Sequence, residues 1–341
     1  MNEKTAYSLS GVDIAAGQKA TELMRLAVEA TYGAEVLAGL GSFGGLYDAN
    51  LLKELNAPVL VASTDGVGTK TKVAARLDQW QTIGRDLVNH CINDILVQGA
   101  RPLFFLDYVA ASKLDPQRIA TIVGGVAAAC REAKCALLGG ETAEMPGVYQ
   151  FGEVDLAGTI VGIVERKRII DGSRIRPGDL LLGLRSTGLH TNGYSLARSV
   201  LEKHDWTTPL AELGCSIGEA LLAVHRSYLE PIRHLMTAGV EIRGLAHITG
   251  GGFRDNLPRI LPEGVGALIQ RGSWPEIPIF RLIQRVGFIP DEEMFHVFNM
   301  GIGMIVVIPS ENVSLARATI PEISVIGTTT AGPSRVIIRE A

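Results

Sequence analysis

The stretch with the clearest chemical potential in this 341-residue chain is residues 63–70, Ser-Thr-Asp-Gly-Val-Gly-Thr-Lys. It follows an apolar run, residues 58–62, that predicts a buried strand. Asp65 could hold a hard cation such as magnesium, Lys70 could meet phosphate oxygens, and the two glycines would let the backbone approach a ligand. It is not a Walker A loop, because Thr69 stands where that motif needs Gly. Taken alone, the stretch could equally be a tight turn with a capped exit.

A polar stripe runs along a helix predicted over residues 85–99. Asp86, Asn89, His90 and Asn93 fall at i, i+3, i+4 and i+7, with Asp94 beside them. Such a stripe on an otherwise apolar helix faces either water or a site. The absence of Lys or Arg from its interior favours a metal–phosphate site.

Two more predicted strands run into acids. Residues 103–109 contain Asp107, and residues 136–138 lead into a glycine-rich loop, residues 139–147, that contains Glu141. Open α/β sheets bind ligands beyond their strand ends, and convergent carboxylates are the ligands that magnesium on a nucleotide prefers. We therefore expect these acids to gather with Asp65 and Asp94 around one site.

The second half of the chain carries two loops suited to an anion. Residues 185–195, rich in Ser, Thr, Gly, His and Asn, precede a predicted helix over 196–201 and could cradle an anion with backbone N–H groups. A capped helix after a long turn is the alternative, but it does not account for His190. Residues 247–253 have the same form, with three consecutive glycines between a strand and a helix, which favours close approach to a ligand.

These loops need two α/β domains to position them. The length suffices for two domains, and the charged, turn-rich residues 165–179 mark the boundary, so we expect domains at 1–170 and 171–341. An apolar share of 47%, 6% aromatics and 39 glycines are typical of an α/β (α+β) enzyme with many tight turns. The remaining predicted strands and helices alternate, without an internal repeat.

Charge and composition exclude several classes of protein. The net charge of −4, with no Lys/Arg cluster, argues against nucleic-acid and membrane-surface partners. We find no signal peptide and no apolar run long enough to span a bilayer. The four cysteines lack Cys-x-x-Cys spacing and are expected to be packed, reduced thiols, so the cytoplasm is the expected location.

Two features near the N-terminus are ambiguous. Residues 39–45 match Gly-x-Gly-x-x-Gly, but a helix-like stretch at 34–38 precedes them and a loop follows, so we reject a dinucleotide site and keep a flexible glycine loop near phosphates. Residues 1–20 form a glycine-flanked segment that we expect to be mobile without ligand, before a helix over 18–30.

Together these motifs resemble the phosphoribosylformylglycinamidine cyclo-ligase family, the aminoimidazole ribonucleotide synthetases of purine biosynthesis. The matching stretches are Gly11-Val12-Asp13-Ile14, Gly44-Gly45, and residues 64–70, 93–94, 139–147, 188–195 and 247–253. They cover nearly the whole chain in order. Selenophosphate synthetase, thiamine-monophosphate kinase and the hydrogenase maturation dehydratase share the Asp-Gly loop and the acids, whereas residues 141–146 and 190–194 point to the cyclo-ligases. Thr191 stands where we expect Ser, which keeps the hydroxyl.

The resemblance implies an ATP-dependent cyclo-ligase that uses magnesium and converts formylglycinamidine ribonucleotide to 5-aminoimidazole ribonucleotide, releasing ADP and phosphate. It implies a homodimer whose N-terminal sheets pair in a shared barrel, and a C-terminal α/β sandwich that binds the ribotide. The metal ligands would be Asp65, Asp94 and Glu141. The ATP-binding set would be Gly44, Gly45, Asp65, Gly66, Gly68, Thr69, Lys70, Asn93, Asp94, Gly139, Gly140 and Glu141. The ribotide set would be Thr187, Gly188, His190, Asn192, Gly250, Gly251 and Gly252. The catalytic candidates are His190, His247 and Lys70, since imidazole titrates near neutrality.

Two other classes of function compete with this one. A selenophosphate synthetase would want a reactive Cys or Sec in the N-terminal segment, and residues 1–90 contain no Cys. A hydrogenase maturation protein would want a C-terminal Cys, yet the chain ends in Ile-Arg-Glu-Ala. A non-catalytic nucleotide-binding subunit would be expected to have lost the acids, and all of them are present.

Overall fold

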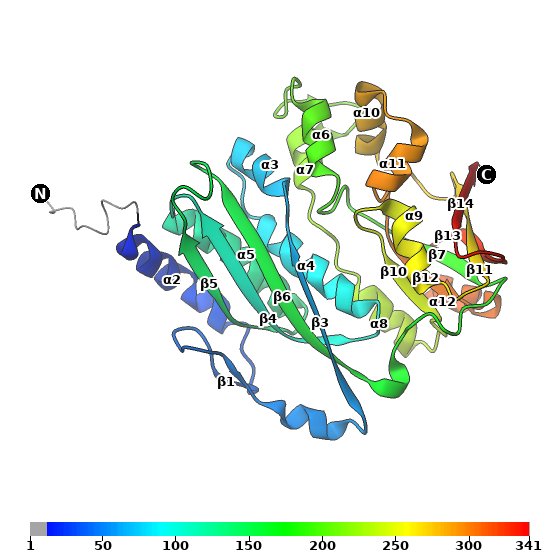
Figure 1. Cartoon of the computed structure of the whole chain (residues 1–341), viewed down its shortest axis with the longest axis horizontal. Coiled ribbons are helices and arrows are strands. Elements are labelled where there is room, and N and C mark those ends of the chain that lie inside the picture. Colours follow the sequence, from blue (N-terminus) through cyan, green and yellow to red (C-terminus); the bar gives the residue numbers. More distant parts are fainter. Residues whose placement is uncertain (1–11, 341) are drawn as a thin grey trace, which may run out of the picture. The chain divides into compact units, whose positions relative to one another are not determined.

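The computed structural model describes residues 12–340 and contains two compact units, each of mixed α/β structure (Figure 1). The first unit runs to Ile95 and resumes over Ala100–Lys167. The second takes Leu96–Gly99 and the chain from Arg168 onward. Residues 1–11, which hold Gly11 and half of the segment expected to be mobile, lie outside the described part. Among the described residues, no helix has the length and apolar character needed to cross a membrane.

The first unit is built on a four-stranded sheet in the order β3-β6-β4-β5. Its strands are β3 (Pro58–Gly66), β6 (Val154–Glu165), β4 (Arg101–Ala111) and β5 (Ala136–Glu144). The β4–β5 pair is parallel and the other two pairs are antiparallel. The unit's α-helices are α2 (Ile14–Glu29), α3 (Lys70–Leu77), α4 (Ile83–Leu96) and α5 (Pro116–Glu132).

Only one face of this sheet is covered by helices of the unit's described residues (Figure 1). Phe105 and Ile160, which pair across β4 and β6, are fully buried. They lie on the helical face, because a Cβ at Gly158 on that face would contact both Phe105 and Leu87 of α4. The alternate positions point to the other face, where Leu60 and Leu106 keep 61% and 38% of their surface exposed. Among the described residues the sheet has two edges, β3 and β5, so residues 12–340 of one copy do not close it into the barrel implied by the resemblance.

A short hairpin precedes the sheet and corrects one prediction. Residues 34–38 were expected to be helical, but β1 (Val36–Ala38) pairs antiparallel with β2 (Leu46–Tyr47). Cross-strand pairing of β-branched Val36 with Tyr47 outweighs the local helical signal. The glycine loop is therefore the tip of a hairpin, in agreement with the rejected dinucleotide site. Helix α2 also begins earlier than predicted, because Asp13 caps it by accepting from the Ala16 N–H.

The second unit contains a six-stranded sheet in the order β10-β12-β7-β13-β11-β14. Its strands are β7 (Leu180–Arg185), β10 (Gly244–His247), β11 (Val265–Arg271), β12 (Ile302–Ile308), β13 (Ser324–Ala331) and β14 (Val336–Glu340). A small hairpin joins β8 (Pro209–Leu210) and β9 (Cys215–Ser216). The α-helices are α6 (Tyr194–Leu201), α7 (Ile217–Leu222), α8 (Leu229–Thr237), α9 (Gly252–Asn256), α10 (Pro278–Gly287), α11 (Asp291–Val297) and α12 (Val313–Thr319). Strand β13, with its run of threonines, was not predicted.

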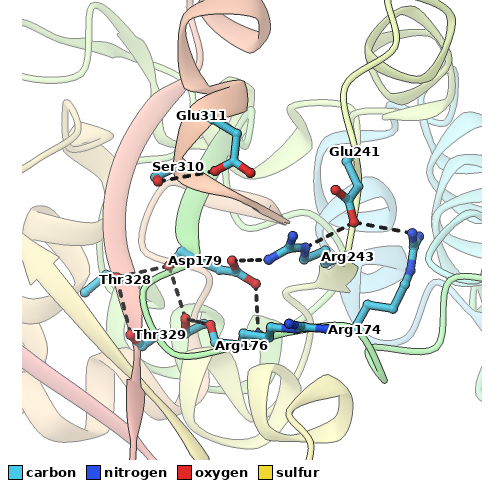
Figure 2. A network of polar contacts seen from close by, with 9 residues as sticks. All are labelled: Arg174, Arg176, Asp179, Glu241, Arg243, Ser310, Glu311, Thr328 and Thr329. Atoms are coloured by element: carbon cyan, nitrogen blue, oxygen red, sulfur yellow. Dashed lines mark hydrogen bonds and ion pairs between the residues drawn. The ribbon is translucent and has the colours of Figure 1, made fainter.

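A network of hydrogen bonds and ion pairs holds the turn before β7, the first strand of the second unit, against neighbouring segments (Figure 2). Asp179 is almost fully buried and accepts from Arg243 Nη1 at 2.6 Å and from the Arg176 N–H at 2.9 Å. The Thr329 N–H donates to the Asp179 carbonyl at 2.8 Å, which ties the turn before β7 to β13. Glu241 accepts from Arg243 Nε at 3.2 Å. A buried carboxylate with one guanidinium donor and one backbone N–H donor satisfies its hydrogen-bonding demand, so this turn is a fixed part of the second unit.

Candidate functional site

The first cluster of functional side chains lies where β3 runs beside α4. Strand β3 carries Asp65 near its end, and α4 presents His90 and Asp94 one turn apart. His90 Nε2 lies 2.9 Å from Asp65 Oδ2 and 3.7 Å from Asp94 Oδ2, and the Ser63 hydroxyl donates to Asp94 at 3.2 Å. The side chains of Asp65 and Asp94 are 43% and 26% exposed, whereas that of His90 is only 4% exposed. The buried imidazole of His90 thus lies next to two partly exposed carboxylates.

The electrostatics of this cluster favour a cation. Burial alone would lower the pKa of His90, but the hydrogen bond with Asp65 and the negative charges of Asp94 and Asp65 outweigh it and raise that pKa. The two carboxylates thus favour a positive charge beside them. Carboxylate oxygens are the donors that magnesium prefers, so Asp65 and Asp94 fit such an ion.

Lys70 lies away from solvent in this structure. It is the first residue of α3, its side chain is fully buried, and its Nζ lies 2.8 Å from Asp86 Oδ2, which is also fully buried. Burial lowers the pKa of Lys70, against the raising effect of Asp86. The Lys70 amine is thus paired with a buried carboxylate, and the predicted contact with phosphate would require it to leave Asp86. Asn93 on α4 is also fully buried.

Glu141 does not join Asp65 and Asp94 within one chain. It belongs to β5, not to the loop that we predicted, and β5 and β3 are opposite edges of the sheet, about 14 Å apart at about 4.8 Å per strand. Register places Asp65, Gly158, Asp107 and Gly140 in one row across the sheet. Because side chains alternate along a strand, Glu141 points to the opposite face from Asp65. The expected convergence of three metal ligands is not seen.

Glu141 instead borders a cavity of about 850 Å³ in the first unit. Helix α2, the loop at Leu40 and Gly41, and the end of β5 form its walls, and Asp107, Gly139 and Gly140 also line it. Its size suits a drug-sized ligand. Burial raises the pKa of Asp107 to about 7. A nucleoside, or phosphates already neutralised by a cation, would suit this acidic lining.

The glycines of the predicted ATP-binding set have local reasons to be glycine. Gly68 has φ of +63°, a left-handed conformation at the turn into α3, just before Thr69. At Gly66 a Cβ would meet the Leu156 carbonyl at 3.0 Å, and at Gly45 it would meet Leu138. Gly44, by contrast, faces open space at the tip of the β1–β2 loop. The structure brings Asp65 and Asp94 together but leaves Gly44 and Gly45 in the hairpin.

The two predicted ribotide loops meet in the second unit. A Cβ at Gly250 would lie 3.2 Å from the Asn192 side-chain oxygen, so the two loops touch. Asn256 Nδ2 donates to the carbonyls of Gly250 and Gly252 at 3.1 and 2.8 Å. Gly251, between them, has a left-handed φ of +90°. The two hydrogen bonds from Asn256 hold this glycine turn in a fixed shape.

The loop that contains Thr187 and Gly188 is held by a second buried asparagine. Asn299 Nδ2 donates to the Gly188 carbonyl at 2.9 Å, and its Oδ1 accepts from the Ser186 hydroxyl at 2.9 Å. The Thr187 N–H donates to His190 Nε2 at 3.3 Å. These contacts preorganise backbone groups around the loop, as binding an anionic ligand requires.

Three buried histidines lie behind the loops: His190, His225 and His247. Their ligand atoms all lie within 4.8 Å of one another, a spacing that could hold a metal ion. However, the rings of His190 and His225 are stacked, with centroids 4.0 Å apart and planes at 16°. In-plane lone pairs of two parallel rings cannot both point at one ion, so the cluster is better suited to hydrogen bonding.

The sequence did not identify four residues of these clusters as site residues: His90, His225, Asn256 and Asn299. His90 was visible in the polar stripe of α4 but was not given a role. His225 and Asn299 contact residues that are distant in the sequence, and Asn256 is one side chain that bonds to the neighbouring glycine turn. His225 lies between α7 and α8, in a segment without a recognisable motif.

Comparison with known proteins shows to which family the chain belongs. The family described as AIR synthase related protein, N-terminal domain, matches residues 47–164, and its C-terminal domain counterpart matches residues 176–339. The chain belongs to this family. Phosphoribosylformylglycinamidine cyclo-ligase of Desulfitobacterium hafniense is 51% identical over 92% of this chain and 91% of its own length. The enzyme of the same name from Alkaliphilus oremlandii is 48% identical over 98% of this chain and its own full length.

Solved structures share the fold at lower identity. Thiamine-monophosphate kinase from Stenotrophomonas maltophilia superposes with a TM-score of 0.67 at 17% identity, covering 93% of this chain and 94% of that one. The hydrogenase maturation protein HypE in complex with ATP gives a TM-score of 0.68 at 19% identity, covering 96% and 92%. The two-unit α/β architecture is therefore that of AIR synthase-like proteins.

Proposed function

We propose that this chain is an ATP-dependent cyclo-ligase that closes the imidazole ring of 5-aminoimidazole ribonucleotide from formylglycinamidine ribonucleotide in purine biosynthesis. The observation that carries this is the near-full-length identity of about half with enzymes named phosphoribosylformylglycinamidine cyclo-ligase. Both domain models of the family match this chain, over residues 47–164 and 176–339.

In this proposal the first unit binds ATP and magnesium. Asp65 and Asp94 would hold the ion, which when bound supplies charge neutralisation to a transferring phosphoryl group. The cavity beside Gly139, Gly140 and Glu141 would receive the nucleotide, since its volume suits such a ligand. ATP in the complex of the structural neighbour HypE supports nucleotide binding by this fold.

The second unit would bind the ribotide. Backbone groups of residues 187–192 and of Gly250–Gly252 would take its phosphate, because both loops are fixed by buried asparagines. ATP's γ-phosphoryl group is passed to the formyl oxygen, giving an imidate phosphate, and the amidine nitrogen then attacks that carbon as phosphate leaves. His247 moves the proton released by the attacking nitrogen.

We further propose a homodimer in the cytoplasm. The open face of the four-stranded sheet, with exposed Leu60 and Leu106, supports pairing with a second copy. Cys91, Cys130 and Cys135 are buried free thiols, which suits a reducing compartment.

The test is a coupled assay of the purified protein with formylglycinamidine ribonucleotide, ATP and magnesium. We expect aminoimidazole ribonucleotide, ADP and phosphate in equal amounts. Phosphorylation of thiamine monophosphate, with no turnover of the ribotide, would instead assign the activity of a structural neighbour and refute the proposal.

A further inference from the structure

Three polar contacts join helix α4 to the segment formed by β3 and the start of α3. They are Asp86 Oδ2 to Lys70 Nζ at 2.8 Å, His90 Nε2 to Asp65 Oδ2 at 2.9 Å, and Ser63 Oγ to Asp94 Oδ2 at 3.2 Å. The three residues of α4 are four positions apart, so they lie along one face of the helix with a rise of about 6 Å between successive contacts. Residue numbers rise along α4 as they fall along the other segment, so the two segments run antiparallel.

The contact between Lys70 and Asp86 differs from the other two in its exposure. Both of its side chains are fully buried, whereas those of Asp65 and Asp94 are 43% and 26% exposed. Asp86 also precedes Asp94 by eight residues, which is about 12 Å along the helix. An ion held by the two exposed carboxylates would therefore lie away from Lys70 as the structure places it.

We propose that Lys70 is a positioning residue, which through Asp86 sets the placement of α4 against β3 and so the distance between the carboxylates of Asp65 and Asp94. This inference rests on the proposed function, in which those two carboxylates hold magnesium for ATP. It gives Lys70 a role different from the phosphate contact that the sequence motif predicted.

The local structure allows Lys70 to act on Asp65. Lys70 begins α3, and only the turn of residues 66–69 separates it from Asp65. Gly68 in this turn has a left-handed φ of +63°, and its carbonyl accepts from the Thr71 N–H at 3.3 Å. A short turn held in this way transmits a displacement of Lys70 to Asp65 instead of absorbing it.

Replacing both members of the pair distinguishes positioning from direct contact. Removing one member leaves the other buried without this partner, whereas replacing both by apolar residues leaves neither. We therefore expect Kd for magnesium-ATP, measured by calorimetry, to rise about 10-fold or more in Lys70→Met and in Asp86→Ala, and to lie within about 5-fold of wild type in the double variant Lys70→Met/Asp86→Ala. The double-mutant cycle also separates the coupling of the two residues from the other contacts that each makes.

A direct phosphate contact by Lys70 predicts the opposite pattern. Asp86→Ala would then bind magnesium-ATP at least as tightly as wild type, and the double variant would bind it as weakly as Lys70→Met. Either result would overturn the inference. Where a single variant does not fold, the double variant decides alone, because a rise of more than about 30-fold in its Kd would indicate the loss of a charge-assisted phosphate contact and would also overturn the inference.

Lys72→Met is the matched control, because Lys72 lies on the same helix but pairs with Glu153, which is not part of α4. Its Kd should stay within about 2-fold of wild type, since a partly exposed ion pair contributes little. A rise in this control as large as that in Lys70→Met would overturn the inference. Binding is measured without the ribotide, so failed turnover of formylglycinamidine ribonucleotide would refute the proposed function, while these Kd values would still decide the role of Lys70.

Discussion

Replacing Asp107 by Asn should stabilise the first unit, increasingly so as pH rises. Asp107 lies on β4 opposite Gly140 of β5, and a Cβ on Gly140 would come within 2.1 Å of its Oδ1. Burial raises the pKa of this carboxyl from its ordinary 3.8 to about 7, and only a hydrogen bond with its own backbone works in the other direction. The folded protein therefore holds a proton that the unfolded chain releases near pH 4.

The sign and size of the effect follow from the two pKa values. The folded state binds more protons than the unfolded state between pH 4 and 7, so wild-type stability falls across this window and levels off above it. A difference of about three pKa units corresponds to at most about 4 kcal/mol at pH 8, and about 2 kcal/mol of this is already present at pH 5. Water in the adjoining cavity would solvate the carboxylate and reduce both figures.

The measurement is the free energy of unfolding by urea, followed by circular dichroism, for wild type and Asp107→Asn from pH 5 to 9. The gap between the two proteins should widen by about 1–3 kcal/mol from pH 5 to pH 8 and then stay constant. Glu263→Gln, an exposed acid-to-amide change in the second unit, should show no such trend. A gap that is constant over the whole range, or one that narrows as pH rises, would refute the assignment of a protonated buried Asp107.

Three further outcomes are expected. Asp65→Asn or Asp94→Asn should lower turnover by the equivalent of about 3 kcal/mol or more with the fold intact, because each removes a charge-stabilising carboxylate; near-normal turnover at saturating magnesium would contradict the metal assignment. Light scattering at micromolar concentration should give twice the chain mass of 36.4 kDa, and an active monomer would exclude the shared barrel. With ¹⁸O in the formyl group of the substrate, the label should appear in inorganic phosphate; label found only in water would rule out phosphoryl activation.

Local patterns predicted most of the elements in this chain. The strands that carry Asp65 and Asp107 and the helix that carries the polar stripe are present, although β4 continues past Asp107 to Ala111. Apolar periodicity and the Pro and Gly boundaries act within a few residues and so are readable from the sequence. Two elements that were not predicted are strands, whose conformation depends on pairing with another strand. Residues 36–38 form a strand through pairing with β2. Strand β13, which lies between β7 and β11, was missed although its Val, Ile and Thr residues favour a strand.

The candidate site was predictable in its residue types but not in its geometry. The sequence predicted that Asp65 and Asp94 would gather at one site, but not that they meet because α4 packs beside β3. Glu141 does not meet them, because β5 extends through the expected loop and a single residue of register decides which face a side chain takes. His225 could not be found from spacing, since its partners Thr191 and His247 come from segments that only the tertiary fold brings together.

The glycines show why residue type alone overstates binding. Their clustering at residues 139–140 and 250–252 suggested close approach to a ligand, yet each cluster has an internal cause. A Cβ at Gly140 would collide with Asp107, and one at Gly252 would lie 2.1 Å from the Phe295 carbonyl. These glycines are required by packing whether or not a ligand binds. Ligand binding is therefore indicated by groups whose presence packing does not explain, namely the half-exposed carboxylate of Asp65 and Gly44 in the β1–β2 loop, where a Cβ would meet nothing.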